Sequence, residues 1–269
     1  MPSVSLSLTL REEYEYLFNT CSIRMNRAQE IQDILDTIDE NATRYQDLGD
    51  ALGIPWFFIA VIHNMESSLN FTKHLHNGDP LTEQTVNVPA GRPPTGSPPF
   101  TWEGSATDAF SLKGLGSQTD WSLAGTLYQL ERYNGWGYRL YHPYVLSPYL
   151  WSFSDHYTSG KYISDGTWSD TAVSKQCGAA VLLRRMAELG EIQFMDQPLP
   201  SENDPPLIVN FSMKKSRDPA IVALAEELQC WLNTFPGIFV RVDGIPGNRT
   251  SEAYKTVSGS FLPGDPRGA

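Results

Sequence analysis

A single glutamate, Glu66, lies in the otherwise apolar and amide-rich stretch IHNMESSLNF. Desolvation of a carboxylate on the core-facing side of a helix raises its pKa, as a general acid near neutral pH requires, whereas a charged neighbouring imidazole would lower it. A carboxylate satisfied by His63, or one at the rim near the helix end, fits the same pattern. The residues that share a helix face with Glu66, three or four positions apart, are Ile59, Ile62, His63 and Asn70.

Two predicted helices and a turn surround this glutamate. Residues 11–48 are helix-rich, because apolar residues recur there with helical spacing between charged ones. Pro55, at a favoured first-turn position, opens a second and more apolar helix that runs to Leu69 and is expected to be central and buried. The Asn77-Gly78 pair, between short and partly alternating segments, then predicts a small β-hairpin. The apolar residues of the first pattern are Ile31, Ile34, Leu35 and Ile38.

The rest of the first 196 residues alternates loops with helices. Residues 89–99 contain so many Pro and Gly residues that they predict an exposed loop. Three further helical patterns begin at a residue that can cap a helix. They are found at about 101–113 with Thr101, at about 120–134 with Asp120, and at about 170–190 with Asp170.

A change of composition divides the chain. Residues 197–206, with the sequence QPLPSENDPP, combine prolines with charged residues and predict an interdomain linker. The linker separates a first domain, 1–196, from a small second domain, 207–269. The second domain is expected to hold one amphipathic helix, a turn-rich centre and a short helix that begins near Thr250.

Composition and charge limit the classes of function. The chain is 41% apolar and 12% aromatic, which is enough to build a core, so wholesale disorder is excluded. Its net charge of -11 disfavours nucleic acid or an anionic membrane surface as the main partner and leaves neutral or cationic polymers. No signal-peptide pattern is visible, which leaves the localisation open, and no stretch approaches the roughly 18 to 20 apolar residues that span a bilayer.

Neither cysteine nor histidine spacing predicts a metal centre. No CxxC motif is present, and His63, His74 and His76 lack the spacing of a ligand set, although the last two are expected on one side of a strand. We therefore expect no metal and no cofactor. The residues expected to be buried small hydrophobic side chains are Cys21, Cys177 and Cys230.

Two segments carry a resemblance to a known superfamily. HNMESSLNF resembles the motif of the lysozyme and lytic-transglycosylase superfamily, in which a helical glutamate is the catalytic acid. ERYNGWGYR, residues 131–139, is similar to the Tyr-Asn-Gly segment that lines the glycan groove of soluble lytic transglycosylases. The resemblance covers about 55–190. It implies a mainly α (α+β), lysozyme-like helical domain with a small β-hairpin, and it implies that Glu66 protonates the leaving oxygen of a glycoside.

The resemblance leaves the second catalytic group open. Asp79 and Thr85 are similar to the Asp and Thr that hold the attacking water in phage-type lysozymes, whereas soluble lytic transglycosylases lack that Asp. If Asp79 faces Glu66 across the groove, hydrolysis with two carboxylates is favoured. If it does not, one glutamate serves as acid and base. Asp79 is equally well read as a turn residue, and Glu83 and Glu103 are weaker candidates.

Substrate contacts are expected beside these groups. Most of the aromatic residues are expected to fill the core. Tyr133, Asn134 and Trp136, which lie in a Gly-rich turn at a helix end, are predicted to contact the glycan. Asn70 and His63, on the helix face of Glu66, complete the predicted substrate-binding set.

The second domain supports the same reading. AEELQCWLNTFPGIFVRVDGIPGNRTSEAYKTVSG resembles the three-helix peptidoglycan-binding module, with Thr250 as a cap for the next helix. The module often accompanies cell-wall hydrolases. The sequence therefore predicts a glycosidase that cleaves β-1,4 bonds of an amino-sugar polymer. The combination of the two domains favours peptidoglycan as that polymer. A chitinase or chitosanase and a non-catalytic glycan-binding protein are the alternatives.

Overall fold

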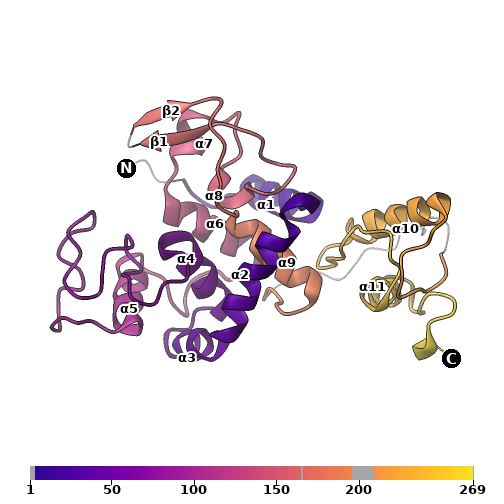
Figure 1. Ribbon diagram of the computed structural model, residues 1–269, viewed down its shortest axis with the longest axis horizontal. Helices are drawn as coiled ribbons and strands as arrows, with labels where there is room; N and C mark the ends of the chain where they lie inside the picture. The colour runs from indigo at the N-terminus through magenta and orange to yellow at the C-terminus, as the bar shows by residue number, and fades with distance from the viewer. Residues whose placement is uncertain (1–3, 165, 196–208, 269) are drawn as a thin grey trace.

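A computed structural model describes residues 4–164, 166–195 and 209–268. With 49% of the chain in helices and 4% in strands, the fold is mainly α, which confirms the predicted class. Figure 1 shows most of the helices gathered into one body, from which a long loop and a two-stranded hairpin project. The helices of this body are α1 (Leu8–Thr20), α2 (Ala28–Glu40), α3 (Ala42–Leu52), α4 (Trp56–Ser67), α5 (Trp102–Leu112), α6 (Leu123–Asn134), α7 (Gly137–Tyr141), α8 (Pro148–Trp151) and α9 (Ala179–Leu189), with the short 3-10 helix η1 (Met25–Arg27).

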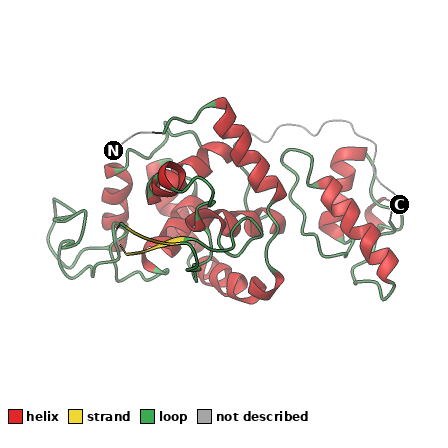
Figure 2. Ribbon diagram, turned by 90° about the horizontal axis from the view of Figure 1, so that it is seen from above, coloured by secondary structure: helices red, strands yellow, loops and turns green. Residues whose placement is uncertain are grey.

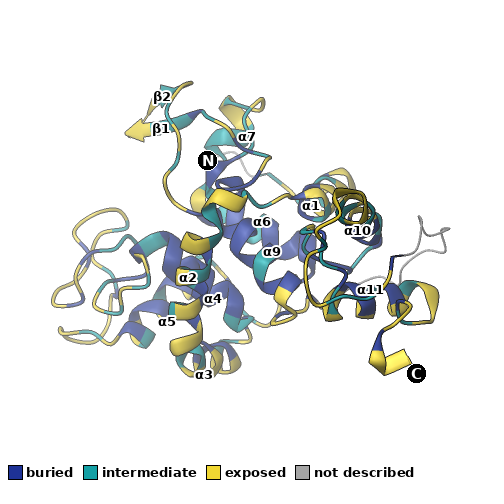
Figure 3. Cartoon of the chain, turned by 45° about the vertical axis from the view of Figure 1, so that its right-hand side comes forward, coloured by how far each residue is buried: buried dark blue, intermediate teal, exposed yellow. Residues whose placement is uncertain are grey.

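The helix that carries Glu66, α4, is the central element, as predicted. Pro55 precedes it, and all of its residues except Trp56 and Glu66 are buried. Helices α3 and α9 pack against it, and α4 is dark blue along most of its length in Figure 3. The apolar stripe of α2 faces the same core through Ile31, Leu35 and Ile38. Glu66, near the end of α4, is therefore held on a helix that is buried along almost all of its length.

The predicted hairpin at Asn77-Gly78 is wrong. The turn forms, with Gly78 at a φ of 78°, but the flanking residues make one isolated bridge, Lys73 with Pro80, and no strand. Backbone bonds cross the turn from His74 to the carbonyl of Asp79 and from Leu81 to that of Thr72. Pro80, which has no backbone N–H to donate, limits the pairing beside it.

The antiparallel sheet of the described residues lies elsewhere. Strands β1 (Lys161–Ser164) and β2 (Thr167–Ser169) form a short hairpin with an irregular register between Tyr162 and Ser164. In Figure 1 this hairpin lies at the top of the picture, beside α7 and above α8.

Of the three helix caps predicted within residues 1–196, two are wrong. Thr101 caps α5 as expected, since its hydroxyl accepts from the N–H of Gly104 at 3.1 Å. Helix α6 is capped by Ser122, while Asp120 forms an ion pair with Arg11 and accepts from the N–H of Ser122. Asp120 has a longer-range partner, so the hydroxyl nearer the helix takes the capping position.

The helix predicted from Asp170 begins nine residues later, at Ala179. Asp170 instead accepts from the indole N–H of Trp168 at 2.7 Å. The chain passes so close to α8 at Gly178 that a Cβ there would lie 2.2 Å from the carbonyl oxygen of Leu150. The helix can start only after this close approach.

The residues after 208 build a second cluster of buried side chains. Its elements are α10 (Pro219–Leu232), α11 (Asn248–Ser258) and the 3-10 helix η2 (Pro266–Gly268), drawn on the right of Figure 2 apart from the other helices. Gln229 is buried and its side chain bonds Asp243, Gly244 and Thr250. Thr250 thus lies inside α11 and bonds the core of the unit, and Gly247, not Thr250, takes the capping position.

The predicted linker, 197–206, lies outside the described residues. Contacts nevertheless join the two clusters: Phe239 packs edge-on against Phe18 with 5.2 Å between ring centroids, and Arg249 donates to the carbonyls of Ala187 and Glu188 at the end of α9. Cys21 and Cys177 are buried as predicted, but Cys230 is exposed.

By length and hydropathy, no single helix of the described residues passes as a membrane span, and the pair α3 and α4 passes only as a unit bent by 115°.

Candidate active site

Glu66 occupies the last turn of α4, beside the phenol of Tyr149. The Tyr149 hydroxyl donates to Oε1 of Glu66 at 2.9 Å. Burial raises the pKa of Glu66 to about 7, against the opposing effects of the Tyr149 hydrogen bond and the charge of Lys113. The side chain keeps some contact with solvent. Glu66 is therefore a carboxyl group poised to exchange a proton near neutral pH.

The backbone around Glu66 is held firmly. Ser68 and Leu69 adopt positive φ angles of 53° and 58°, which are uncommon for residues other than glycine. The Gln176 side chain donates to the carbonyl of Met65 at 2.9 Å, and a Cβ on Gly78 would lie 3.1 Å from the carbonyl oxygen of Glu66. Strained backbone fixed by its surroundings in this way is typical of functional sites.

Tyr133 and Lys113 form the buried side of the site. Tyr133 is almost fully enclosed, and its hydroxyl donates to the carbonyl of Leu75 at 3.2 Å. The Lys113 amine lies 4.6 Å from the centre of the Tyr133 ring and donates to the Tyr133 carbonyl at 3.2 Å. Burial, and to a smaller extent the charge of Glu66, raises the pKa of Tyr133 well above its usual value, so this phenol, predicted as a glycan contact, is a neutral neighbour of the acid.

A groove of about 1090 Å³ has Tyr149, the hydrogen-bond partner of Glu66, in its wall, while Glu66 itself lies behind that wall. Two of its lining residues, Tyr149 and Gln176, are the same residues that bond the end of α4. Asn134 and Trp136, for which the sequence predicted glycan contacts, also line it, and the Trp136 ring lies tilted against Tyr128 with 5.1 Å between centroids. The other walls come from α7 and from the β1–β2 hairpin, through Tyr138, Tyr141, Lys161, Tyr162 and Ser164.

A second cavity, of about 680 Å³, lies between α1, α2 and residues 230–242. The carboxylate in its wall, Glu188, is paired with Arg184 and Arg185. Two arginines thus hold the Glu188 carboxylate, whereas the pKa of Glu66 is raised. The groove beside Glu66 is therefore the candidate active site.

His63 is a correction to the predicted substrate-binding set. Its ring is fully buried, 4.5 Å from Phe71 and 4.6 Å from Trp102 between ring centroids, and Nδ1 lies 2.9 Å from the hydroxyl of Tyr45. Burial lowers the pKa of His63 to about 4, so the ring is neutral. His63 fills the core and neither touches a ligand nor satisfies Glu66, whose hydrogen bond comes from Tyr149.

Asp79 is engaged by its own loop. Its Oδ2 accepts from the Asn77 side chain and from the N–H groups of Val86 and Asn87, and Oδ1 accepts from the Asn87 side chain at 2.7 Å. These bonds lower the pKa of Asp79. The charged group that acts on the pKa of Glu66 is Lys113. The carboxylate of Asp79 therefore has the surroundings of a loop anchor.

Thr85 and Asn70 have partners of the same kind. The buried Thr85 hydroxyl donates to the Pro89 carbonyl at 2.5 Å and accepts from the N–H of Arg92 at 2.9 Å. The Asn70 side-chain oxygen accepts from the N–H and the hydroxyl of Thr72. Both side chains thus organise the loops that follow α4.

A substitution at Asp79 tests its role as a loop anchor. Because the folded pKa of Asp79 is lowered, its carboxylate stabilises the fold above the ordinary pKa of about 4, and this contribution is lost as the pH falls through the folded pKa. We expect Asp79→Asn to lower Tm at pH 7 and to differ less from the wild type in acid. Thermal unfolding followed by circular dichroism at both pH values measures this, and an equal deficit at both would contradict it.

Three groups of the site carry no local sequence signal for their role. Lys113 ends α5, Tyr149 lies in α8 and Gln176 lies in the loop before α9, and each reaches the end of α4 from far along the chain. For Tyr149, the sequence shows only that it belongs to an aromatic-rich segment.

Comparison of the chain with protein-family models, with curated proteins and with solved structures finds no match.

Proposed function

We propose that the protein is a glycosidase that cleaves β-1,4 bonds of an amino-sugar polymer, with Glu66 as the general acid. The observation that carries this proposal is the carboxyl group of Glu66, with a pKa of about 7, bonded to a wall residue of an open groove. Glycoside cleavage needs such an acid to protonate the leaving oxygen. The groove is lined by Trp136, Asn134 and several tyrosines, and such aromatic and amide side chains can stack on sugar rings and bond their hydroxyls.

The hydrogen bond from Tyr149 has a defined part in this chemistry. Because it engages Oε1, Oε2 is the oxygen left to carry the proton that passes to the glycosidic oxygen. Once the proton has left, Tyr149 and Lys113 both favour the resulting carboxylate, since each lowers the pKa of Glu66. Burial and these two groups thus balance the acid between its two protonation states.

The surroundings of Asp79 favour a mechanism with one carboxylate. Its four hydrogen bonds to Asn77, Val86 and Asn87 serve the loop, which supports the alternative in which Glu66 acts as acid and then as base. In that sequence Glu66 gives its proton to the leaving oxygen. It then takes the proton of a hydroxyl of the same sugar as that hydroxyl closes on the anomeric carbon. The product has an anhydro end, as in a lytic transglycosylase acting on peptidoglycan.

The experiment that tests the proposal is mass spectrometry of soluble products from peptidoglycan, chitin oligomers and chitosan. Anhydro ends from peptidoglycan support the one-carboxylate mechanism, and reducing ends restore Asp79 as a candidate. Cleavage of chitosan alone would favour the chitosanase reading, which the net charge of -11 suits because that polymer is cationic. Binding of any of the three without cleavage would overturn the enzyme reading.

The Tyr149 hydrogen bond makes a prediction about pH. Activity requires protonated Glu66, so it should fall as the pH rises through about 7. Because the Tyr149 bond lowers the pKa of Glu66, Tyr149→Phe should move this alkaline limb to higher pH. The rate of product release between pH 5 and 9 measures it, with Tyr141→Phe, an exposed groove tyrosine, as the control. A limb that stays in place would show that Tyr149 does not tune the acid.

A further inference from the structure

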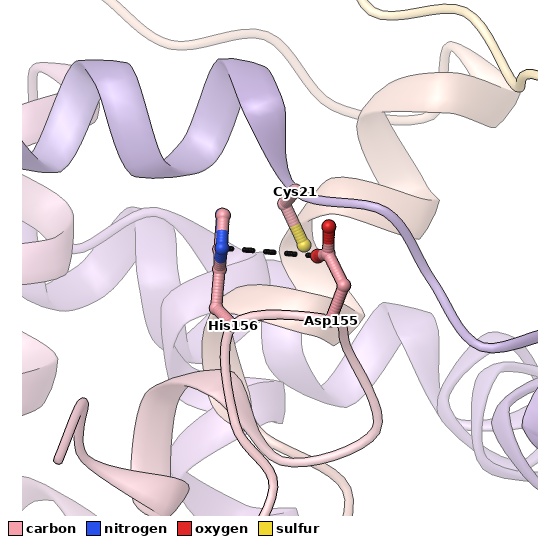
Figure 4. Close-up of side chains that lie close together, drawn as sticks. All are labelled: Cys21, Asp155 and His156. Carbon is pink, nitrogen blue, oxygen red and sulfur yellow. Dashed lines mark ion pairs between the residues drawn. The ribbon is translucent and has the colours of Figure 1, made fainter.

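A second cluster of reactive side chains lies away from the groove. Cys21, at the end of α1, meets Asp155 and His156, which follow α8. The thiol sulfur, one carboxylate oxygen and one imidazole nitrogen all lie within 4.8 Å of one another. Figure 4 shows the three side chains converging, with His156 Nδ1 3.8 Å from Asp155 Oδ1. Separations of this size are close to those between ligands of one small cation.

The backbone fixes these three residues against each other. Asp155 donates its N–H to the carbonyl of Ser22 at 3.0 Å, and Ser22 returns its own N–H to Oδ1 of Asp155 at 2.9 Å. Ile23 and Ser154 form a β-bridge beside them. The cluster is thus preorganised by two segments that are more than a hundred residues apart in sequence.

The second nitrogen of His156 gives an independent indication. Nε2 lies 2.8 Å from the carbonyl oxygen of Leu17. A carbonyl only accepts, so Nε2 carries a hydrogen, and Nδ1 is the nitrogen left on the side of Asp155, 3.8 Å from its Oδ1, where a cation could take the place of a proton. A histidine whose far nitrogen donates to a backbone carbonyl is the usual state of a metal-bound imidazole.

We infer that Cys21, Asp155 and His156 bind one divalent zinc ion. Thiolate and imidazole donors together with a carboxylate are the ligand types that zinc takes, and soft sulfur disfavours magnesium and calcium. Asp155 is exposed, so a water molecule completes the tetrahedron from the solvent side. Cys21 is only 4% exposed, which argues against a role as a free nucleophile.

The ion would brace one wall of the groove. The residue after the cluster, Tyr157, donates its hydroxyl to the carbonyl of Gly160 at 3.2 Å and accepts from the N–H of Ser174 at 3.1 Å. Gly160 leads into β1, and Ser174 lies two residues before Gln176, so both ends of the hairpin segment depend on this anchor. Zinc bound here would tie the end of α1 to the segment that leads to the base of the hairpin.

The inference is tested by titrating the reduced, chelator-treated full chain with Co²⁺, a spectroscopic substitute for Zn²⁺. We expect one equivalent to give the near-ultraviolet band of a cobalt–thiolate bond and the visible bands of a tetrahedral site, and Zn²⁺ to abolish both. Cys21→Ser should lose the near-ultraviolet band, whereas Cys230→Ser, at an exposed cysteine outside the cluster, should keep it. No thiolate band, or a band lost in Cys230→Ser alone, would overturn the proposal.

A second variant guards against misfolding. Asp155→Asn keeps an oxygen that can accept from Ser22 but removes the charge of the ligand. We expect its Tm without metal to match the wild type and its Co²⁺ affinity to fall by about tenfold or more, so that a given concentration of Zn²⁺ raises the Tm of the wild type more than that of the variant. Unchanged Co²⁺ affinity, or no effect of Zn²⁺ on the wild-type Tm, would contradict a metal site.

Discussion

Glu66→Gln is expected to lower the rate of glycan cleavage by about a hundredfold to ten-thousandfold, the usual contribution of a general acid. The substitution keeps the shape of the side chain and an oxygen that can accept from Tyr149, but it removes the proton that the leaving oxygen needs. Product release from purified peptidoglycan, followed by mass spectrometry, measures the loss. The matched control is Glu103→Gln, at a more exposed glutamate paired with Arg44, and it should leave the rate nearly unchanged.

Stability gives a way to separate lost chemistry from lost folding. The folded pKa of Glu66 is raised to about 7, so ionised Glu66 destabilises the fold, and this cost grows as the pH rises from the ordinary pKa of about 4 to the folded value. Glu66→Gln has no such cost and should be at least as stable as the wild type at pH 8. An inactive variant with a lower Tm at pH 8 would point to misfolding, and an active one would remove Glu66 as the acid.

Local patterns in the sequence predicted the parts of the site that depend on local structure. The helical spacing around Glu66 and the Pro55 start placed the acid in α4, and the Gly-rich turn after α6 placed Asn134 and Trp136 on an open surface. Both inferences rest on residues a few positions apart, where periodicity and turn chemistry are informative. The position of an acid on its helix is therefore readable without the fold.

The predictions were wrong where contacts between residues far apart in the sequence determine the structure. His63 shares its helix face with Glu66, yet Phe71 and Trp102 close over it, and no helical period reveals that. The pair Asn77-Gly78 does turn the chain, but Pro80 has no backbone N–H to extend the pairing, and an isolated bridge is what forms. Tyr149 bonds Glu66 from another helix altogether. Contacts of this kind are set by packing, which a single sequence does not display.

A buried ion pair next to the groove provides the largest expected effect on stability. Arg139, in α7, bonds Glu131 of α6 through Nη2 at 2.8 Å and Glu13 of α1 through Nη1 at 3.0 Å. Glu131 is only 3% exposed, and the hydroxyl of Tyr14 is its other partner. Arg139→Met would leave this carboxylate buried without a countercharge, which costs about 3–5 kcal/mol of unfolding free energy.

Two comparisons make this prediction specific. Lys215→Met removes the exposed pair with Glu226 and should change the unfolding free energy by about 0–1 kcal/mol. Adding Glu131→Gln to Arg139→Met should recover a large part of the loss, because the stranded charge is then gone. Urea unfolding of the four chains measures these differences. If Arg139→Met costs no more than Lys215→Met, the pair does not hold α1, α6 and α7 together, and the groove wall formed by α7 must be fixed by the aromatic contacts of Tyr138 with Tyr162 and Trp168.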